Sequence, residues 1–142
     1  MSKLRVTLRV DFDDNAAIGP GKIALLEKML ESGSLSQAAR ELDMSYRRAW
    51  QLLDTMNRIF RAPLVKTSIG GAGGGGAVLT ELGQSVITAY RSFEEETNAR
   101  AASHFQFVAR QVAADAPVVR RSLSKTPRPA GRARTARVAA KR

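Results

Sequence analysis

The chain has 142 residues, a formal net charge of +10 and no cysteine. These values exclude disulfides and thiolate metal sites, and no apolar run approaches the roughly 18 residues that a membrane helix needs. Residues 1–109 carry 13 Lys or Arg against 12 Asp or Glu, whereas residues 110–142 carry 10 against one. We therefore expect a polyanionic partner, which the basic C-terminal part attracts and the preceding domain recognises.

The first elements are a strand and a helix. Residues 4–12 alternate between apolar and polar side chains, which predicts one half-buried strand that ends at residues 13–15. Pro20 suits the first turn of a helix, and Gly33 suits its C-terminal cap. The apolar stripe of this helix consists of Ile23, Leu26, Met29 and Leu30.

Residues 33–53 indicate two helices joined by a tight turn. Ser34 and Ser45 are predicted N-caps, and Gln37 stands at the capping-box position after Ser34. Polar side chains oppose the apolar stripe of the second helix, which is the helix-turn-helix pattern of a DNA-binding protein. The predicted joint core is Ile23, Leu26, Leu30, Ala38, Ala39, Leu42, Leu52, Leu53, Met56 and Phe60.

A wing is predicted directly after this motif. Pro63 ends the second helix, and short strands over 64–69 and 77–80 flank a glycine-rich loop over 70–76. The N-terminal strand could add a third member to this sheet. The loop formally matches G-x-G-x-x-G, but a strand follows where a dinucleotide site needs a helix. We therefore favour a DNA-contacting wing over a nucleotide site or a plain linker.

The C-terminal part is predicted to contain a long helix and a disordered tail. Thr80 can cap a helix that spans about 80–112, and its apolar seam suggests pairing with a second copy. Beyond it the chain is rich in Arg, Lys, Ala and Pro without an apolar period. We expect a domain over 1–112 and a disordered basic tail over 113–142. The candidate dimerisation residues are Leu82, Val86, Tyr90 and Phe93.

The expected fold is mainly α with a small antiparallel sheet, a winged helix-turn-helix. Residues 19–97 resemble the LysR-type winged-helix domain in plan, through the segments 33–39, 63–65 and 79–83. Residues 4–100 more closely resemble the N-terminal domain of ModE-type molybdate-responsive regulators, as the segments at 45–50, 56–57 and 70–80 show. Full-length members of that family carry molybdate-binding domains where this chain has its basic tail. The resemblance thus implies DNA binding and dimerisation, and gives no support for molybdate sensing by this chain.

The candidate DNA-binding residues come from three places. The start of the second helix would enter the major groove, where Arg pairs with guanine and Gln with adenine. The candidates there are Ser45, Tyr46, Arg47, Arg48 and Gln51. Phosphate contacts are expected from the start of the preceding helix and from the wing: Ser36, Gln37, Lys66, Thr67, Gly71, Gly73, Gly74 and Gly75. Trp50 could pack against the domain, meet the DNA backbone or touch a thymine methyl group.

Other functions find little support in these residues. His104 is the only histidine, so neither a zinc site nor a Ser–His–acid triad is expected, and the acids at 94–96 lack a partner for acid–base catalysis. We expect no enzyme, no cofactor, no metal and no membrane contact. The segment at Met1 does not resemble a signal peptide, which favours a bacterial cytoplasmic, nucleoid-associated location.

The expected function is sequence-specific transcriptional control by a homodimer on an inverted-repeat site in double-stranded DNA. The alternative is an architectural or nucleoid-associated protein that binds DNA broadly and is anchored by the basic tail.

Overall fold

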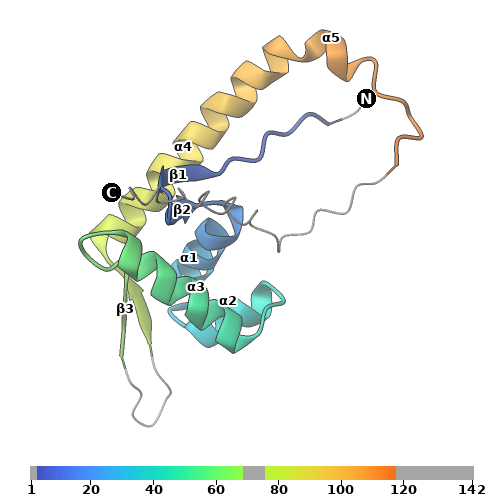
Figure 1. Cartoon of the computed structure of the whole chain (residues 1–142). Coiled ribbons are helices and arrows are strands. Elements are labelled where there is room, and N and C mark those ends of the chain that lie inside the picture. Colours follow the sequence, from blue (N-terminus) through green and yellow to red (C-terminus); the bar gives the residue numbers. More distant parts are fainter. Residues whose placement is uncertain (1–2, 69–75, 118–142) are drawn as a thin grey trace, which may run out of the picture.

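The computed structural model describes residues 3–68 and 76–117, and it is mainly helical with two small antiparallel sheets (Figure 1). This agrees with the fold class predicted from the sequence. The order of elements is β1 Val10–Asp13, β2 Ala16–Ile18, α1 Pro20–Ser32, α2 Leu35–Glu41, α3 Tyr46–Ile59, β3 Val65–Thr67, β4 Ala77–Leu79, α4 Glu81–His104 and α5 Gln106–Ala109.

The N-terminal prediction of one strand over 4–12 is wrong. β1 begins only at Val10 and forms its own hairpin with β2, so it does not join the sheet of β3 and β4. Residues 3–9 instead run alongside α4. The Val6 N–H donates to Asn98 Oδ1 at 2.8 Å, and the Tyr90 hydroxyl donates to the Leu8 carbonyl at 2.9 Å. The alternation therefore reflects packing against a helix as well as sheet formation.

The predicted helix caps are confirmed. Ser34, Ser45 and Thr80 each accept a hydrogen bond from a backbone N–H in the first turn of the helix that follows. Pro20 opens α1, and Gly33 ends it in the left-handed conformation with φ 67°. These local signals account for the starts of α1, α2, α3 and α4 and for the end of α1.

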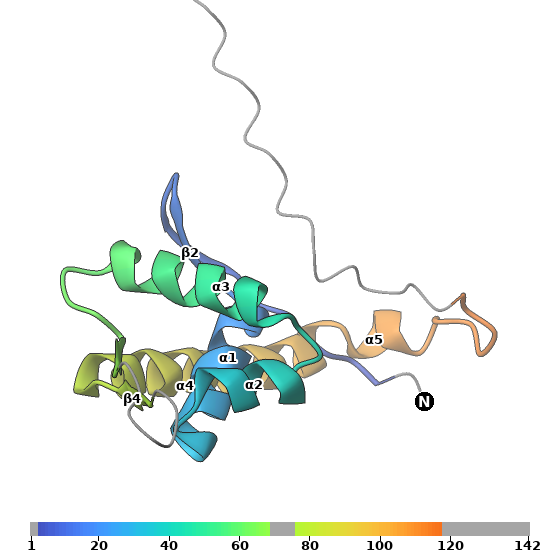
Figure 2. The ribbon, with the colours of Figure 1, turned by 90° about the horizontal axis from the view of Figure 1, so that it is seen from below.

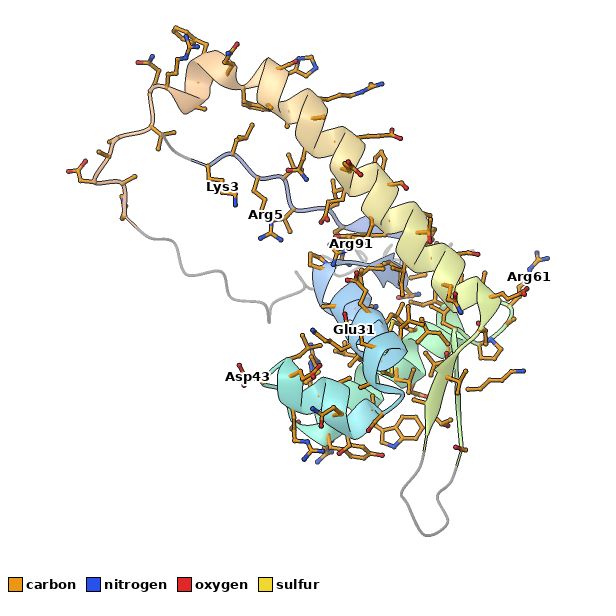
Figure 3. The ribbon with its side chains drawn as sticks, turned by 180° about the vertical axis from the view of Figure 1, so that it is seen from behind. Lys3, Arg5, Glu31, Asp43, Arg61 and Arg91 are labelled. Carbon is orange, nitrogen blue, oxygen red and sulfur yellow. The ribbon has the colours of Figure 1, made fainter. Side chains whose placement is uncertain are left out.

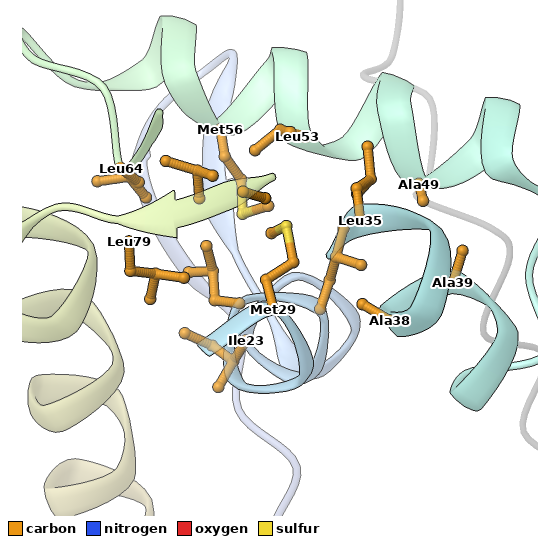
Figure 4. Packing of buried hydrophobic residues seen from close by; sticks show 14 of the residues in the cluster. Ile23, Met29, Leu35, Ala38, Ala39, Ala49, Leu53, Met56, Leu64 and Leu79 are labelled. Carbon is orange, nitrogen blue, oxygen red and sulfur yellow. The ribbon is translucent and has the colours of Figure 1, made fainter. Parts of the chain in front are cut away.

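The core lies where α1, α2, α3 and the β3–β4 hairpin meet, with α3 facing α1 across it (Figure 4). Most of the predicted core is present, with Leu42, Leu52 and Phe60 packed at its edge. Leu30 is a wrong prediction because it is 51% exposed, whereas Leu25, which was not predicted, is fully buried. The apolar surface of α1 is shared among α2, α4 and β4, so a single stripe does not describe it.

α4 crosses α1 and then extends beyond the rest of the domain (Figures 1 and 3). The Arg91 guanidinium on α4 binds the carboxylates of Glu27 on α1 and of Glu94 on α4. The continuous helix predicted to about 112 is interrupted, because α4 ends at His104 and α5 is a separate short turn of helix. Residues 113–117 are exposed, and residues 118–142 of the predicted tail lie outside the described residues.

Candidate nucleic-acid interface

The two helices α2 and α3 are joined by a turn of the expected length. Asp43, labelled in Figure 3, adopts a left-handed conformation with φ 52°. Asp is among the residues that tolerate this conformation best. The Met44 N–H donates to the Ala39 carbonyl at 3.0 Å and closes the turn. The turn positions Ser45 as the N-cap of α3, with the predicted reading residues directly behind it.

The outward side of α3 carries three of the polar residues predicted to read bases. Arg47, Arg48 and Gln51 are exposed, while Ala49 and Leu53 on the opposite side of α3 are fully buried. Among the described residues, the side chains of Arg47, Arg48 and Gln51 have no hydrogen-bond or ion-pair partner. Arg58 differs, because its Nε lies 3.1 Å from Asp54 Oδ2. The first two turns of α3 therefore offer unused donors to an outside ligand.

A second group of cations lies beside Arg48. The Lys22 Nζ donates to the Ala17 carbonyl at 2.7 Å. Partial burial lowers the pKa of Lys22, and the positive charges of Arg9 and Arg48 lower it further. The Arg9 guanidinium pairs with Asp11 at 2.8 Å, so its charge is partly offset. This clustering of positive charge was not predicted, because the three cations come from separate segments of the chain.

One side chain of α3 hydrogen-bonds to the base of the wing. Asn57 Oδ1 accepts from the N–H groups of Leu64 and Val65 at 2.9 and 3.2 Å, and Asn57 Nδ2 donates to the Val65 carbonyl at 3.1 Å. Within the hairpin, Val65 pairs with Leu79 and Thr67 with Ala77. Lys66 and Thr67 are exposed, as a DNA-contacting wing requires. Gly71, Gly73, Gly74 and Gly75 lie outside the described residues.

The start of α2 offers fewer free backbone groups than expected. The Gln37 N–H is taken by the Ser34 hydroxyl at 3.2 Å, and the Gln37 side chain donates to Glu41 instead of closing a full capping box. Ser36 and Gln37 are both exposed. Their side chains, together with the Ser36 N–H, remain the groups that could meet a phosphate at this position.

On the other flank of α3 lie two large aromatic side chains. Tyr46 is 54% exposed and Trp50 is 44% exposed. Trp50 therefore does not belong to the core cluster, and about half of its surface is left to solvent or to a ligand. The β1–β2 hairpin projects past α3 (Figure 2), and the Phe12 ring meets the Phe60 ring edge-on at 5.6 Å between centroids.

The four candidate dimerisation residues do not form one exposed seam. Tyr90 is only 4% exposed and Val86 packs at the edge of the core, so both are used within their own protomer. Leu82 and Phe93 are 37% and 53% exposed. A role in dimerisation is thus geometrically open to Leu82 and Phe93, whereas Val86 and Tyr90 on the same side of α4 are covered by other parts of the chain.

Other ligand sites are poorly supported in residues 3–68 and 76–117. Two open surface hollows of about 460 and 790 Å³ lie along α4 and beside α5, and their linings contain one acid, Glu81, and one base, Arg110, in different hollows. Within this part of the chain, His, Asp and Glu side chains do not gather in threes as a metal ion would need. No helix in it combines the length and apolar character of a membrane span.

The geometry agrees with a comparison to known families. Residues 21–84 match the model described as bacterial regulatory helix-turn-helix protein, lysR family. This segment is similar to a LysR-type helix-turn-helix. The match begins in α1 and ends in the first turn of α4, so it includes both helices of the motif and the wing.

Similar curated proteins align with the same part of the chain. The molybdenum-pterin-binding protein MopB of Rhodobacter capsulatus is 44% identical over 79 residues, which are 56% of this chain and 29% of that protein. The molybdenum transport protein ModE of Azotobacter vinelandii is 38% identical over 89 residues, or 63% of this chain and 33% of that protein. The DNA-binding transcriptional dual regulator ModE of Escherichia coli K12 is 45% identical over 71 residues, or 50% and 27%. The predicted resemblance is confirmed, and the chain spans about a third of the length of these relatives.

Proposed function

We propose that this chain is a sequence-specific, DNA-binding transcriptional regulator that acts as a homodimer. The observation that carries the proposal is the capped helix α3, whose unpaired Arg47, Arg48 and Gln51 side chains face outward beside a wing. Arg and Gln side chains on the first turns of such a helix are the standard readers of guanine and adenine in the major groove. The LysR-type segment and the regulator relatives support the same function.

The proposed dimer places two recognition helices on one face of the DNA. Two copies related by a two-fold axis would contact half-sites about 34–36 Å apart, on an inverted repeat. The exposed Leu82 and Phe93 of α4 support an interface on this helix. An apolar contact of this kind excludes water from side chains that a monomer leaves exposed.

Binding-site selection from random duplexes tests this proposal. The full chain is expected to enrich an inverted repeat, and its affinity for the enriched site should exceed that for a scrambled duplex by at least about a thousandfold. Enrichment of no motif, with equal affinity for both duplexes, would instead favour the architectural alternative. One observation supports that alternative, which is the net charge of +9 in residues 110–142.

Deletion of residues 118–142 separates the two functions further. A regulator should keep its preference for the enriched site and lose part of its salt-dependent affinity. With fewer Lys and Arg residues to neutralise phosphates, binding releases fewer counterions from the DNA. An architectural protein anchored by these residues should lose most of its binding. Molybdate binding is not part of the proposal for this chain, and calorimetric titration with molybdate is expected to give no heat of binding.

A further inference from the structure

The side chains of Trp50 and Tyr46 are more exposed than large aromatic rings usually are in a folded domain. They retain 44% and 54% of their accessible surface, and neither the indole N–H nor the phenol has a hydrogen-bond partner among the described residues. Other aromatic rings of the chain are equally exposed, but these two lie one turn apart on the helix that carries the exposed Arg47 and Gln51, and this grouping indicates a ligand surface.

The two rings share one flank of the recognition helix. Tyr46 precedes Trp50 by one turn, and Asn57 follows Trp50 by two turns, so the three side chains leave α3 in similar directions. Asn57 binds the base of the wing through Leu64 and Val65. The aromatic flank is therefore the side of α3 that faces the wing, nearer to the start of the helix.

The opposite flank has different chemistry. Arg48 lies two positions before Trp50, on the side where Lys22 and Arg9 bring further positive charge. Arg47 and Gln51 lie between the two flanks on the outward side. A major groove presents guanine acceptors and thymine methyl groups as distinct features, and only the methyl group is apolar. The cationic flank suits phosphate or guanine, and the aromatic flank suits thymine.

We propose that the Trp50 indole contacts the C5-methyl group of a thymine in the major groove, with Tyr46 beside it, and that this contact selects thymine at one position of each half-site. This assignment rests on the proposed DNA-binding function. A DNA base is the expected ligand of the two rings because they lie beside the unpaired Arg47 and Gln51 side chains. If these side chains read bases, the major groove also lies against Trp50 and Tyr46.

The fluorescence of the protein gives a direct readout, because Trp50 is the only tryptophan of the chain. Acrylamide should quench Trp50 in the free protein, and the enriched duplex should protect it. A scrambled duplex at the same salt concentration should protect it less. Equal quenching with and without the enriched duplex would overturn the assignment, because the indole would then lie outside the interface.

Uracil substitution tests the methyl group itself. Each thymine of the enriched site is replaced in turn by uracil, which removes only the methyl group, and affinities are measured for the wild type, Trp50→Ala and Trp50→Phe. The wild type is expected to lose about fourfold in affinity at one position per half-site, the value of one buried methyl group. Trp50→Ala should lose this dependence, and Trp50→Phe should keep part of it. Phe107→Ala, which removes a 74% exposed ring from α5, is the matched control and should behave as wild type.

Two results would overturn the assignment while leaving DNA recognition intact. One is a wild type that tolerates uracil at every thymine, and the other is a Trp50→Ala variant with unchanged thymine dependence. In either case Trp50 contacts the backbone or nothing. Failure of the proposed function itself is distinguishable, because selection would then enrich no motif in the wild type.

Discussion

Asn57 ties the recognition helix to the wing through both backbone groups of Val65. Its Oδ1 accepts the Val65 N–H at 3.2 Å, and its Nδ2 donates to the Val65 carbonyl at 3.1 Å. The same oxygen accepts the Leu64 N–H at 2.9 Å. These hydrogen bonds, together with the burial of Leu64 and Val65, fix the direction in which β3 leaves α3, and hence how the wing stands relative to the reading residues.

Replacement of this side chain should loosen the wing. Asn57→Ala leaves the two N–H groups without their acceptor, and we expect a loss of roughly 1–3 kcal/mol in the free energy of unfolding. Asn57→Asp keeps the acceptor but loses the donor, so its loss should be smaller. Urea denaturation compares the three proteins. An unchanged midpoint in Asn57→Ala would show that the wing is held by its apolar contacts alone.

Gly83 is predicted to be required for the packing of α4 against the loop before β3. A Cβ atom at this position would lie 2.3 Å from the Leu64 carbonyl oxygen, which is backbone and cannot rotate away. Gly83→Ala should therefore destabilise the fold by roughly 1–3 kcal/mol, although alanine is the better helix former.

Gly21→Ala is the matched control for this substitution. A Cβ at Gly21 of α1 would meet nothing within 4 Å. The control should be neutral or stabilising by up to about 1 kcal/mol. Thermal unfolding of the two variants measures the contrast, and equal melting temperatures would contradict the packing described for Gly83.

Tyr90 predicts a pH dependence of stability. Burial raises the pKa of Tyr90 above its ordinary value of 10.0, and its hydroxyl donates to the Leu8 carbonyl only while protonated. The protonated form is thus favoured in the folded state. Its contribution to the stability of the fold is fully present below pH 10 and is lost as the pH rises above that value. Tyr90→Phe should cost about 1 kcal/mol at neutral pH.

The difference in the free energy of unfolding between wild type and Tyr90→Phe should shrink above pH 10. Ionisation removes the hydroxyl proton of the wild type, and with it the hydrogen bond to Leu8 that the variant already lacks. Denaturation curves at pH 7, 9 and 11 measure it. A constant difference across this range would mean that the hydrogen bond to Leu8 contributes nothing to stability.

The oligomeric state should depend on Phe93. Phe93→Glu places a charge on the exposed ring position of α4, where an apolar dimer contact would have to bury it. We expect the variant to sediment as a monomer at concentrations at which the wild type is a dimer. Phe107→Glu changes a comparably exposed ring on α5 and should remain dimeric. Dimerisation of both variants would exclude this part of α4 from the interface.

Features encoded by local sequence could be predicted reliably. Ser34, Ser45 and Thr80 define helix starts through hydrogen bonds to nearby backbone, and the strands around the glycine loop pair as their composition indicated. The exposed Arg47, Arg48 and Gln51 followed from the apolar periodicity of the same helix. These predictions needed only contacts between residues at most 14 positions apart in the chain.

Features that depend on tertiary packing could not be predicted in the same way. The segment before β1 alternates like a strand, yet it packs along α4 through Val6 and Leu8, about ninety and eighty positions from their partners. From the sequence alone, Tyr90 could equally belong to an exposed apolar seam of α4, because its contact with Leu8 is not visible in the sequence. The approach of Lys22 to Arg48 likewise depends on how α1 crosses α3.

The most direct test of α3 as the recognition helix is the affinity of Arg47→Ala/Arg48→Ala for the enriched duplex. The control is Arg100→Ala/Arg110→Ala, which removes the same number of positive charges outside α3. Loss of two base-reading guanidinium groups should weaken binding to the enriched duplex by at least roughly thirtyfold. Binding to a scrambled duplex should change far less, and the circular dichroism spectrum should stay the same. An Arg47→Ala/Arg48→Ala variant that binds the enriched duplex as tightly as Arg100→Ala/Arg110→Ala would contradict the assignment of α3 as the recognition helix.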